Sequence, residues 1–231
     1  MRRMLPFVPT AQRFIEAQPW FPSAPLGLQQ RLRAEVFATQ SDKGTVMMPA
    51  GSAVQGWHAV LSGLVMLQSP VSKGRSSAFI GVPDGEWFGE GSAMKPEPRK
   101  YNVVALRPTT LLCLPLPLFD VLRETHLAFN QFLVLHLNMR LGQAMTIIEA
   151  GRTQSTEHRV ALYLSRLFWR STRRLNLTQD ELGQLVGLSR QTVNRVLRTL
   201  EELGIVSLDF GKVAIVDDDA LSAYLAATAV A

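Results

Sequence analysis

Residues 177–206 contain the feature that most limits what this chain can fold into. They read LTQDELGQLVGLSRQTVNRVLRTLEELGIV, in which Thr178 is a suitable N-cap and Glu181, three residues later, completes a capping box. Gly187 then ends the first helix, because glycine adopts a positive φ without steric cost. Ser189 is placed to cap a second helix. The pattern predicts a helix, a tight turn and a second helix.

The second predicted helix has two chemically different faces. Its apolar stripe predicts the buried side and consists of Val193, Val196, Leu197, Leu200 and Leu203. Its polar face carries Arg190, Gln191, Asn194, Arg195 and Arg198. Amide and guanidinium groups near the start of an exposed helix suit the base edges in the major groove of DNA. The alternative is a surface helix hairpin with solvated arginines, but the agreement of caps, turn and polar face favours DNA binding.

The positive charge of the chain gathers around this motif. The 231 residues have a formal net charge of +5, with 47% apolar and 19% charged residues, which is typical of a globular protein. Residues 152–200 hold nine arginines against Glu157, Asp180 and Glu181, a net +6, so the rest of the chain sums to −1. The excess therefore lies where phosphate neutralisation would require it.

Several classes of protein are excluded by what the sequence lacks. The single cysteine, Cys113, excludes a disulfide framework within one chain, a four-cysteine iron–sulfur cluster and a structural zinc site of several thiolates. No apolar run approaches the roughly 20 residues that cross a bilayer. The first ten residues, MRRMLPFVPT, are too short in their apolar part for a secretory signal. We expect a cytoplasmic protein with no membrane partner and no metal site.

Between about Asp42 and Leu116 the pattern changes to short runs of β type, separated by recurring glycines. The runs are Thr45–Met48, Ala59–Leu61, Leu64–Leu67, Ala78–Val82, Tyr101–Leu106 and Thr110–Leu114. This rhythm predicts an antiparallel sandwich or roll with tight corners. Residues 1–40 precede it with one helical stretch that Pro19, Pro22 and Pro25 interrupt, and we assign no chemistry to it.

A long helix is predicted from about Leu127 to Thr153. Leu127, Asn130, Val134, Leu137, Leu141, Ala144 and Ile148 alternate spacings of three and four, which is typical of a coiled-coil seam with one polar position. A second stripe of Phe132, Leu135, Met139 and Met145 is placed to face the β-domain. A helix buried within one chain is the alternative, but two apolar stripes favour a homodimer. Its predicted interface consists of Val134, Leu137, Leu141, Ala144 and Ile148.

The remaining residues complete a C-terminal domain. A helix capped at Ser155 or Thr156 is expected to run through Phe168. After the helix–turn–helix, Ile205–Leu208 and Lys212–Val216 flank Asp209-Phe210-Gly211 and predict the β-hairpin of a winged helix, and Asp217–Asp219 is expected to cap a last short helix. The expected fold is α+β. It comprises a helix and β-roll sensor domain over 1–126, a dimerisation helix over 127–153 and a winged helix-turn-helix domain over 155–231.

This order of parts resembles the cyclic-AMP receptor and fumarate–nitrate regulator (CRP/FNR) superfamily of bacterial transcription factors. The stretch LVGLSRQTVNR, residues 185–195, is similar to the recognition-helix signature of that family. The stretch PDGEWFGE, residues 83–90, resembles the entrance to the phosphate cassette of its β-roll. The resemblance implies a jelly roll like that of cyclic-nucleotide-binding domains, a homodimer and a palindromic double-stranded DNA operator. It also implies a small-molecule effector of unknown identity and contact with RNA polymerase.

The resemblance further implies roles for residues of the motif. The base-reading set is Arg190, Gln191, Asn194 and Arg195, and the phosphate-binding set is Thr178, Ser189 and Thr192. The two arginines would bind guanine O6 and N7 in the major groove. The chain has Gln191 where the cyclic-AMP receptor has glutamate. Because glutamine both donates and accepts, it suits adenine or tolerates several bases, so we expect a different half-site at that base pair.

The effector pocket is where the chain departs from the family. Relatives that bind cyclic nucleotides use Gly-Glu, an Arg-Ser pair further on, and hydroxyls from the dimer helix. Gly89 and Glu90 are present here, but the later pair reads Lys100-Tyr101, or Arg99-Lys100 if the gap shifts by one, and the helix positions hold Ala144 and Met145. Lysine cannot replace the bidentate guanidinium fork, and the missing hydroxyls remove contacts to adenine. We therefore do not expect cyclic AMP to bind in the usual way.

A haem-dependent or cyclic-nucleotide-dependent regulator, an enzyme and a non-DNA-binding dimerisation module are the alternatives. His58, His126, His136 and His158 lie in no haem-attachment motif, although His136 in the long helix could be a ligand. His58 is the only histidine within the roll, so a metal enzyme of cupin type is not expected, and no triad or phosphate-loop motif is evident. We expect no catalytic residues and assign no cofactor. The dimerisation module would show no salt-dependent affinity for duplex DNA.

Overall fold

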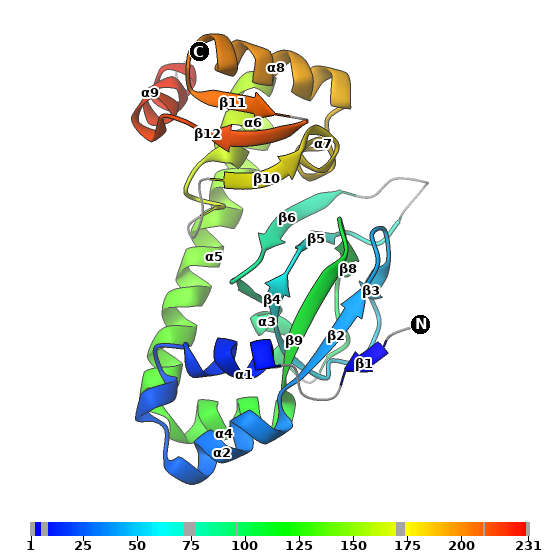
Figure 1. The fold of residues 1–231 in the computed structure, drawn as a ribbon, viewed down its shortest axis with the longest axis vertical. Helices are drawn as coiled ribbons and strands as arrows, with labels where there is room; N and C mark the ends of the chain where they lie inside the picture. Colours follow the sequence, from blue (N-terminus) through cyan, green and yellow to red (C-terminus); the bar gives the residue numbers. More distant parts are fainter. Residues whose placement is uncertain are drawn as a thin grey trace. The chain divides into compact units, whose positions relative to one another are not determined.

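The structure is a computed structural model in which residues 3–5, 9–71, 77–95, 97–169, 174–209 and 211–229 are described. Helices and strands follow one another along the chain (Figure 1), so the α+β class predicted from the sequence is confirmed. The chain divides into two compact units, Met1–Ser76 with Ile80–Arg140 and Ser77–Phe79 with Leu141–Ala231. This division falls inside helix α5 (Leu127–Thr153).

Two antiparallel sheets form the predicted β-roll of the first unit. The first sheet has the order β1 (Arg3–Leu5), β2 (Phe37–Ser41), β9 (Thr109–Pro115), β4 (Gly56–Ser62) and β7 (Trp87–Phe88). The second has the order β3 (Val46–Met48), β8 (Asn102–Ala105), β5 (Leu64–Gln68) and β6 (Ala78–Pro83). Buried apolar side chains from both sheets form one core, among them Met47, Val60, Val65 and Phe88.

The N-terminal forty residues contain more structure than the single helical stretch expected. They form α1 (Pro9–Glu16), a short 3-10 helix (Phe21–Ser23), α2 (Leu26–Glu35) and the strands β1 and β2. Pro22 lies in the first turn of the 3-10 helix and Pro25 is the N-cap of α2, and both positions tolerate proline because the first amides of a helix have no partner within it. Strand β2 was not predicted, since FATQS shows no alternation of apolar residues and becomes a strand through its pairing with β9.

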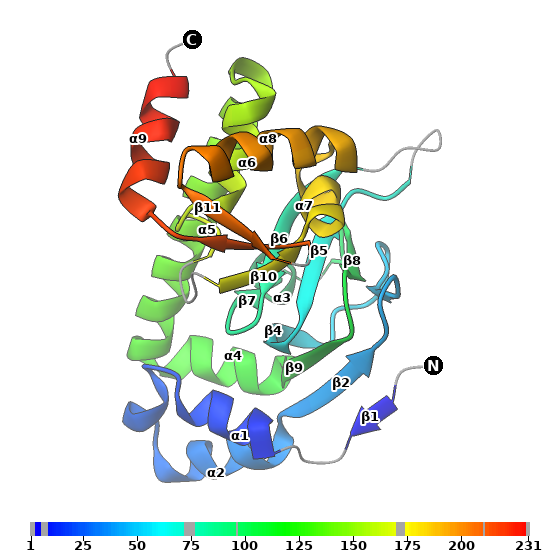
Figure 2. The ribbon, with the colours of Figure 1, turned by 45° about the horizontal axis from the view of Figure 1, so that its top comes forward.

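A second core is built mainly from aromatic rings. The rings of Trp57 on β4 and Trp87 on β7 stack with their centres 4.2 Å apart, and Trp20 meets Phe129 of α5 edge-on at 5.0 Å. The Trp87 Nε1–H donates to the side-chain oxygen of Gln18 over 2.9 Å. Helices α1, α2 and α4 (Leu116–Thr125) contribute to this core and lie together in Figure 2. The N-terminal helices therefore have a structural role that the sequence did not reveal.

Helix α5 has the predicted bounds, but its rotation differs in part from the prediction. Within the first unit its buried side consists of Phe129, Leu133 and His136. The prediction that the stripe with Phe132 and Leu135 faces the β-domain is wrong in part. Phe132 packs against the aromatic core, but Leu135 is exposed. The rotation of α5 about its axis is set by Phe129, whose ring packs against those of Trp20 and Trp57.

The second unit is a winged helix, as predicted. Helices α6 (Thr156–Leu164), α7 (Gln179–Val186) and α8 (Arg190–Glu202) precede the hairpin of β11 (Val206–Asp209) and β12 (Lys212–Ile215), and α9 (Asp218–Thr228) follows. Phe210 of the predicted hairpin lies outside the described residues. Strand β10 (Arg174–Thr178), which pairs with β12, was not predicted. Helix α6 ends earlier than expected, because Ser165 is extended, and Phe168 is buried beyond it.

Replacing Gly56 by alanine tests the packing of the roll. An added Cβ would lie 2.2 Å from the Leu114 carbonyl oxygen and 2.6 Å from Cys113 Sγ, both on β9. Since β4 and β9 are held by their pairing, we expect Gly56→Ala to destabilise the unit by about 1–3 kcal/mol and to lower its Tm in calorimetry. Gly91→Ala on α3 (Glu90–Ala93) is the control, because nothing lies within 4 Å of its added methyl. Equal Tm values for the two variants would contradict this account of the β4–β9 contact.

Candidate nucleic-acid interface and ligand pocket

Helices α7 and α8 are joined as the sequence predicts. The Thr178 hydroxyl accepts the Glu181 amide over 3.2 Å, and the Glu181 carboxylate accepts the Thr178 amide over 2.8 Å, which completes the capping box. Gly187 has a φ of 68°, and the amide of Leu188 donates to the Gly183 carbonyl over 2.9 Å. A Cβ on Gly183 would lie 2.9 Å from the Leu188 carbonyl oxygen. The turn therefore favours glycine at 187 because of its positive φ, and at 183 because a side chain would crowd the Leu188 carbonyl.

Helix α8 separates into the two predicted faces, with one exception. The buried row consists of Val193, Val196, Leu197 and Leu200. Leu203 was expected in that row but is exposed, because it lies past the helix end at the C-cap. Of the polar set, Arg190, Gln191, Arg195 and Arg198 are exposed, whereas Thr192 and Asn194 are half-buried. Because the buried row fixes the rotation of the helix, the exposed side chains point away from the domain core.

Two candidate base-reading residues have partners within the protein. The Gln179 amide nitrogen donates to the Asn194 side-chain oxygen over 3.0 Å and so orients that amide. Arg195 Nη2 lies 3.5 Å from Glu157 Oε1, and both side chains are exposed. An exposed ion pair of this kind contributes about 0–1 kcal/mol, so a nucleic acid can displace it at little cost.

The candidate phosphate-binding hydroxyls differ in availability. The Ser189 hydroxyl accepts the Thr192 amide over 3.1 Å at the start of α8, and the two hydroxyls lie 2.9 Å apart. The Thr178 hydroxyl donates to the Glu181 carboxylate over 3.0 Å, so its hydrogen is engaged in the cap.

Two further polar residues near this face were not identified from the sequence. Lys212 is exposed on β12 and pairs across the strands with Thr178 at the start of α7. The sequence could have indicated Lys212, because this lysine directly follows the glycine of the predicted hairpin. Gln179 had no such signal, because its contact with Asn194 joins residues fifteen positions apart.

The residues expected around the effector are brought together only in part. Arg99 is 3% exposed, and its Nη1 donates to the Tyr101 hydroxyl over 3.4 Å. Gly89 has a φ of 87°, and a Cβ added to it would lie 3.3 Å from Arg99 Nη1. Lys100 lies instead in an exposed ion pair, with its Nζ 3.3 Å from Glu97. The structure therefore places Arg99, and not Lys100, beside Gly89.

Glu90, the other half of the Gly-Glu pair, faces helix α5. Its Oε2 lies 3.5 Å from His136 Nε2, and both side chains are largely buried. Burial opposes ionisation of Glu90, but the contact with His136 and the charges of His136 and Arg140 outweigh it, so its pKa lies below the usual value. The rings of Trp57 and Phe132 enclose His136 further. A sugar hydroxyl would have to compete with His136 for this carboxylate.

A cavity of about 340 Å³ lies next to the loop between β3 and β4. Its polar lining consists of Ser52, Gln55, His58 and Arg99, and the apolar part comes mainly from β3. Of the described residues, neither Gly89 nor Glu90 lines it. The cavity therefore shares only Arg99 with the predicted effector pocket.

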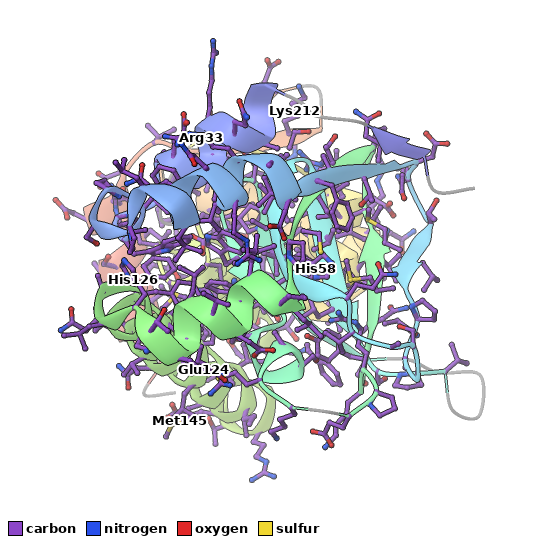
Figure 3. The ribbon with its side chains drawn as sticks, turned by 90° about the horizontal axis from the view of Figure 1, so that it is seen from below. Arg33, His58, Glu124, His126, Met145 and Lys212 are labelled. Atoms are coloured by element: carbon purple, nitrogen blue, oxygen red, sulfur yellow. The ribbon has the colours of Figure 1, made fainter. Side chains whose placement is uncertain are left out.

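The outward face of α5 is apolar along most of its length. Its side chains that are more than half exposed are Leu127, Val134, Leu135, Leu141, Met145 and Ile148. Ala144 is also exposed, whereas Leu137, another residue of the predicted interface, packs against the aromatic core of its own chain. Met145 can be located in Figure 3. Ala144 and Met145 stand at the helix positions where relatives that bind cyclic nucleotides have hydroxyl groups. Here both side chains lack a hydroxyl and are exposed.

Within the described ranges, no helix is long and apolar enough to cross a lipid bilayer. The same part of the chain brings together no group of three histidine, cysteine or carboxylate side chains that could hold a metal ion. Cys113 is buried in β9.

Comparisons with known proteins agree with these two units. Residues 158–224 match the Crp-like helix-turn-helix domain, and residues 39–126 match the cyclic nucleotide-binding domain. The chain is similar to the cyclic AMP receptor protein of Thermus thermophilus, with 32% identity over 181 residues that cover 75% of this chain and 81% of the relative. It is also similar to the transcriptional regulator SdrP of the same species, with 30% identity over 168 residues that cover 69% and 79%.

Solved structures show the same architecture. A CRP/FNR-family transcriptional regulator of Thermus thermophilus matches with a TM-score of 0.59 and 25% identity, covering 83% of this chain and 99% of that one. FixK2 of Bradyrhizobium japonicum shares the fold with a TM-score of 0.69 at 17% identity, covering 81% and 96%. The two domains, the curated relatives and the shared architecture agree. This chain therefore belongs to the CRP/FNR family of DNA-binding transcriptional regulators, which are not enzymes.

Proposed function

We propose that this regulator acts as a homodimer and reads a palindromic operator with the two copies of α8. The exposed polar face of α8 carries the proposal, since Arg190, Gln191 and Arg195 lie outside a row of buried residues. The two arginines suit guanine O6 and N7, and the oriented amide of Asn194 suits adenine. These groups lie in the first half of the helix, which is the part that recognition helices direct at base edges.

Phosphate contacts would surround this face. The start of α8 offers Ser189 and Thr192, whose hydroxyls accompany the free amides of a helix N-terminus. Near the start of α7, Lys212 supplies a positive charge opposite Thr178, whose hydroxyl is already engaged by Glu181. Such contacts set the register on the duplex without reading its sequence.

The outward face of α5 supports the dimer. A row of exposed leucine, valine, methionine and isoleucine side chains is unusual on the surface of a monomer and is typical of a helix that packs against a second copy. Two copies joined along α5 would present two recognition helices to half-sites about 34–36 Å apart.

The β-roll is proposed to sense an effector other than cyclic AMP bound in the usual way. One relative is named a cyclic AMP receptor protein, but here His136 faces Glu90, and the helix positions hold Ala144 and Met145. The same contact disfavours His136 as a haem ligand. We propose that the signal shifts the long helices and turns the winged domains about residues 153–155, where α5 ends and Ser155 is extended, and that the regulator then acts on RNA polymerase.

Replacing Arg195 by alanine tests its assignment as a base-reading residue. We expect Arg195→Ala to cost about 1–3 kcal/mol of binding free energy on the best operator and to relax specificity there, measured by fluorescence anisotropy on sites selected from random DNA. Arg166→Ala is the control, because Arg166 forms a comparable exposed ion pair with Asp218. A uniform loss of affinity on all sequences would instead make Arg195 a phosphate contact.

Gln191 is expected to set one base pair of the half-site. The substitution Gln191→Glu should move the preference at that position toward cytosine, because a carboxylate can only accept from the cytosine amino group. Binding-site selection with both proteins measures the change. An unchanged preferred base would refute the role of this side chain in readout.

The proposed dimer can be broken through α5. Because Leu141 lies exposed in the middle of the apolar row, we expect Leu141→Glu to place two like charges in the seam and yield monomers in sedimentation velocity. Leu26→Glu on α2 makes the same chemical change at another exposed leucine and should leave the dimer intact. Monomeric wild-type protein, or a dimer of unchanged stability with Glu at position 141, would contradict the proposed interface.

A further inference from the structure

The side chain of Asn194 is held by a residue of another helix. Asn194 is half-buried on α8, directly after the buried Val193. The side-chain nitrogen of Gln179, the first residue of α7, donates to the Asn194 side-chain oxygen over 3.0 Å. Helices α7 and α8 lie next to each other (Figure 2). This hydrogen bond therefore connects a candidate base-reading side chain to a residue outside the recognition helix.

Both side chains of this pair extend from fixed backbone. Gln179 directly follows the N-cap Thr178, whose capping box fixes the first turn of α7. The burial of Val193 fixes the rotation of α8 at the neighbouring position. Moving either helix would open the cap or expose part of the buried row. The packing of the domain therefore holds the two amides within hydrogen-bond distance of each other.

The two ends of an amide side chain have opposite hydrogen-bonding character. The oxygen accepts and the nitrogen donates, so a half-turn of the amide exchanges donor and acceptor. Adenine presents the N6 donor beside the N7 acceptor in the major groove, and an asparagine at a fixed position matches this pair in only one of its two orientations. An amide without a partner adopts both orientations, and its selection of adenine is correspondingly weaker.

Gln179 favours one of these two orientations. Its donated hydrogen stabilises the orientation in which Oδ1 of Asn194 lies toward α7. The oxygen keeps a second lone pair, which remains for the N6–H of adenine. The positive end of the α7 dipole favours the Gln179 oxygen on its own side, and this leaves the Gln179 nitrogen for Asn194. An orientation set before DNA arrives lowers the cost of ordering the side chain on binding.

We propose that Gln179 is a positioning residue for sequence readout, which makes Asn194 select adenine without contacting the base itself. The inference rests on the proposed function and deepens it, because it assigns the specificity at one base pair to a residue outside α8. The alternative is that Gln179 contacts a phosphate directly. Phosphate contacts strengthen binding to all sequences alike, so base preference and overall affinity distinguish the two roles.

Binding of the full-length protein to four operator duplexes tests the proposal. The duplexes differ only at the base pair whose preference Asn194→Ala removes, in both half-sites. We expect the wild type to prefer adenine there, and Gln179→Leu to reduce that preference about fivefold, because the amide of Asn194 then adopts both orientations. The preferences at the base pairs read by Arg190 and Arg195 should stay unchanged.

Gln184→Leu is the matched control. Gln184 also lies on α7, and its side-chain nitrogen also donates over 3.0 Å, but to Asp180 of its own helix. This variant loses the same kind of hydrogen bond and should keep every base preference. The Tm of each variant is measured alongside. A purely structural role of Gln179 would lower the Tm and leave the ratios between the four duplexes unchanged, which would contradict the proposal.

A double-mutant cycle shows whether Gln179 acts through Asn194. Adding Gln179→Leu to Asn194→Ala should change binding no further, because the side chain that Gln179 positions is already absent. If Gln179 contacts a phosphate, the added substitution weakens binding to all four duplexes by the same factor, and the proposal is wrong.

Gln179→Glu gives a second and independent readout. A carboxylate cannot donate, so Asn194 has to turn its nitrogen toward position 179, and the preference for adenine should fall further than in Gln179→Leu. The added negative charge lowers the affinity for every duplex, and for this reason the ratio between duplexes is compared. A wild type that prefers another base at this pair, or a preference for adenine that Gln179→Glu leaves intact, would overturn the inference.

The outcomes separate this inference from the proposed function. Wild-type protein that binds none of the duplexes refutes the proposed function. Sequence-specific binding that stays unchanged in Asn194→Ala, or in both Gln179 variants, refutes only the positioning role of Gln179.

Discussion

The burial of one row of α8 is the contact on which the DNA-binding unit depends. A helix of thirteen residues is marginally stable alone, so its position comes from packing its apolar side against the rest of the domain. Val193, Val196, Leu197 and Leu200 form that side, and rotating the helix would expose them to water. The capping box and the left-handed turn at Gly187 fix where the helix begins. Apolar packing therefore determines where the arginines point.

Helix α5 has a comparable division between two apolar faces. One face carries Phe129 and Leu133 into the aromatic core of the roll, where Trp20, Trp57 and Trp87 give it a fixed rotation. The opposite face remains exposed and apolar in a single chain. The boundary between the two compact units falls within this helix.

Polar side chains buried inside the roll are a further departure from purely apolar packing. Glu90 and His136 lie in contact between α3 and α5, and Arg99 is buried without a carboxylate among the described residues. Buried charges stabilise a fold less than well-packed apolar groups do, so a roll with only a structural role gains little from them.

Short-range patterns in the sequence predicted the helix–turn–helix, the bounds of α5, the glycine-punctuated roll and the wing. Those patterns succeed because caps, turns and helical spacing act between residues a few positions apart. They failed for β2 and β10, which are strands through pairing with β9 and β12, and for the rotation of α5 around Phe129. The choice of Arg99 over Lys100 as the buried cation, and the partner of Glu90, were decided only by the tertiary structure. Each depends on side chains that are distant in the chain and meet only when the sheets and helices close around a common core.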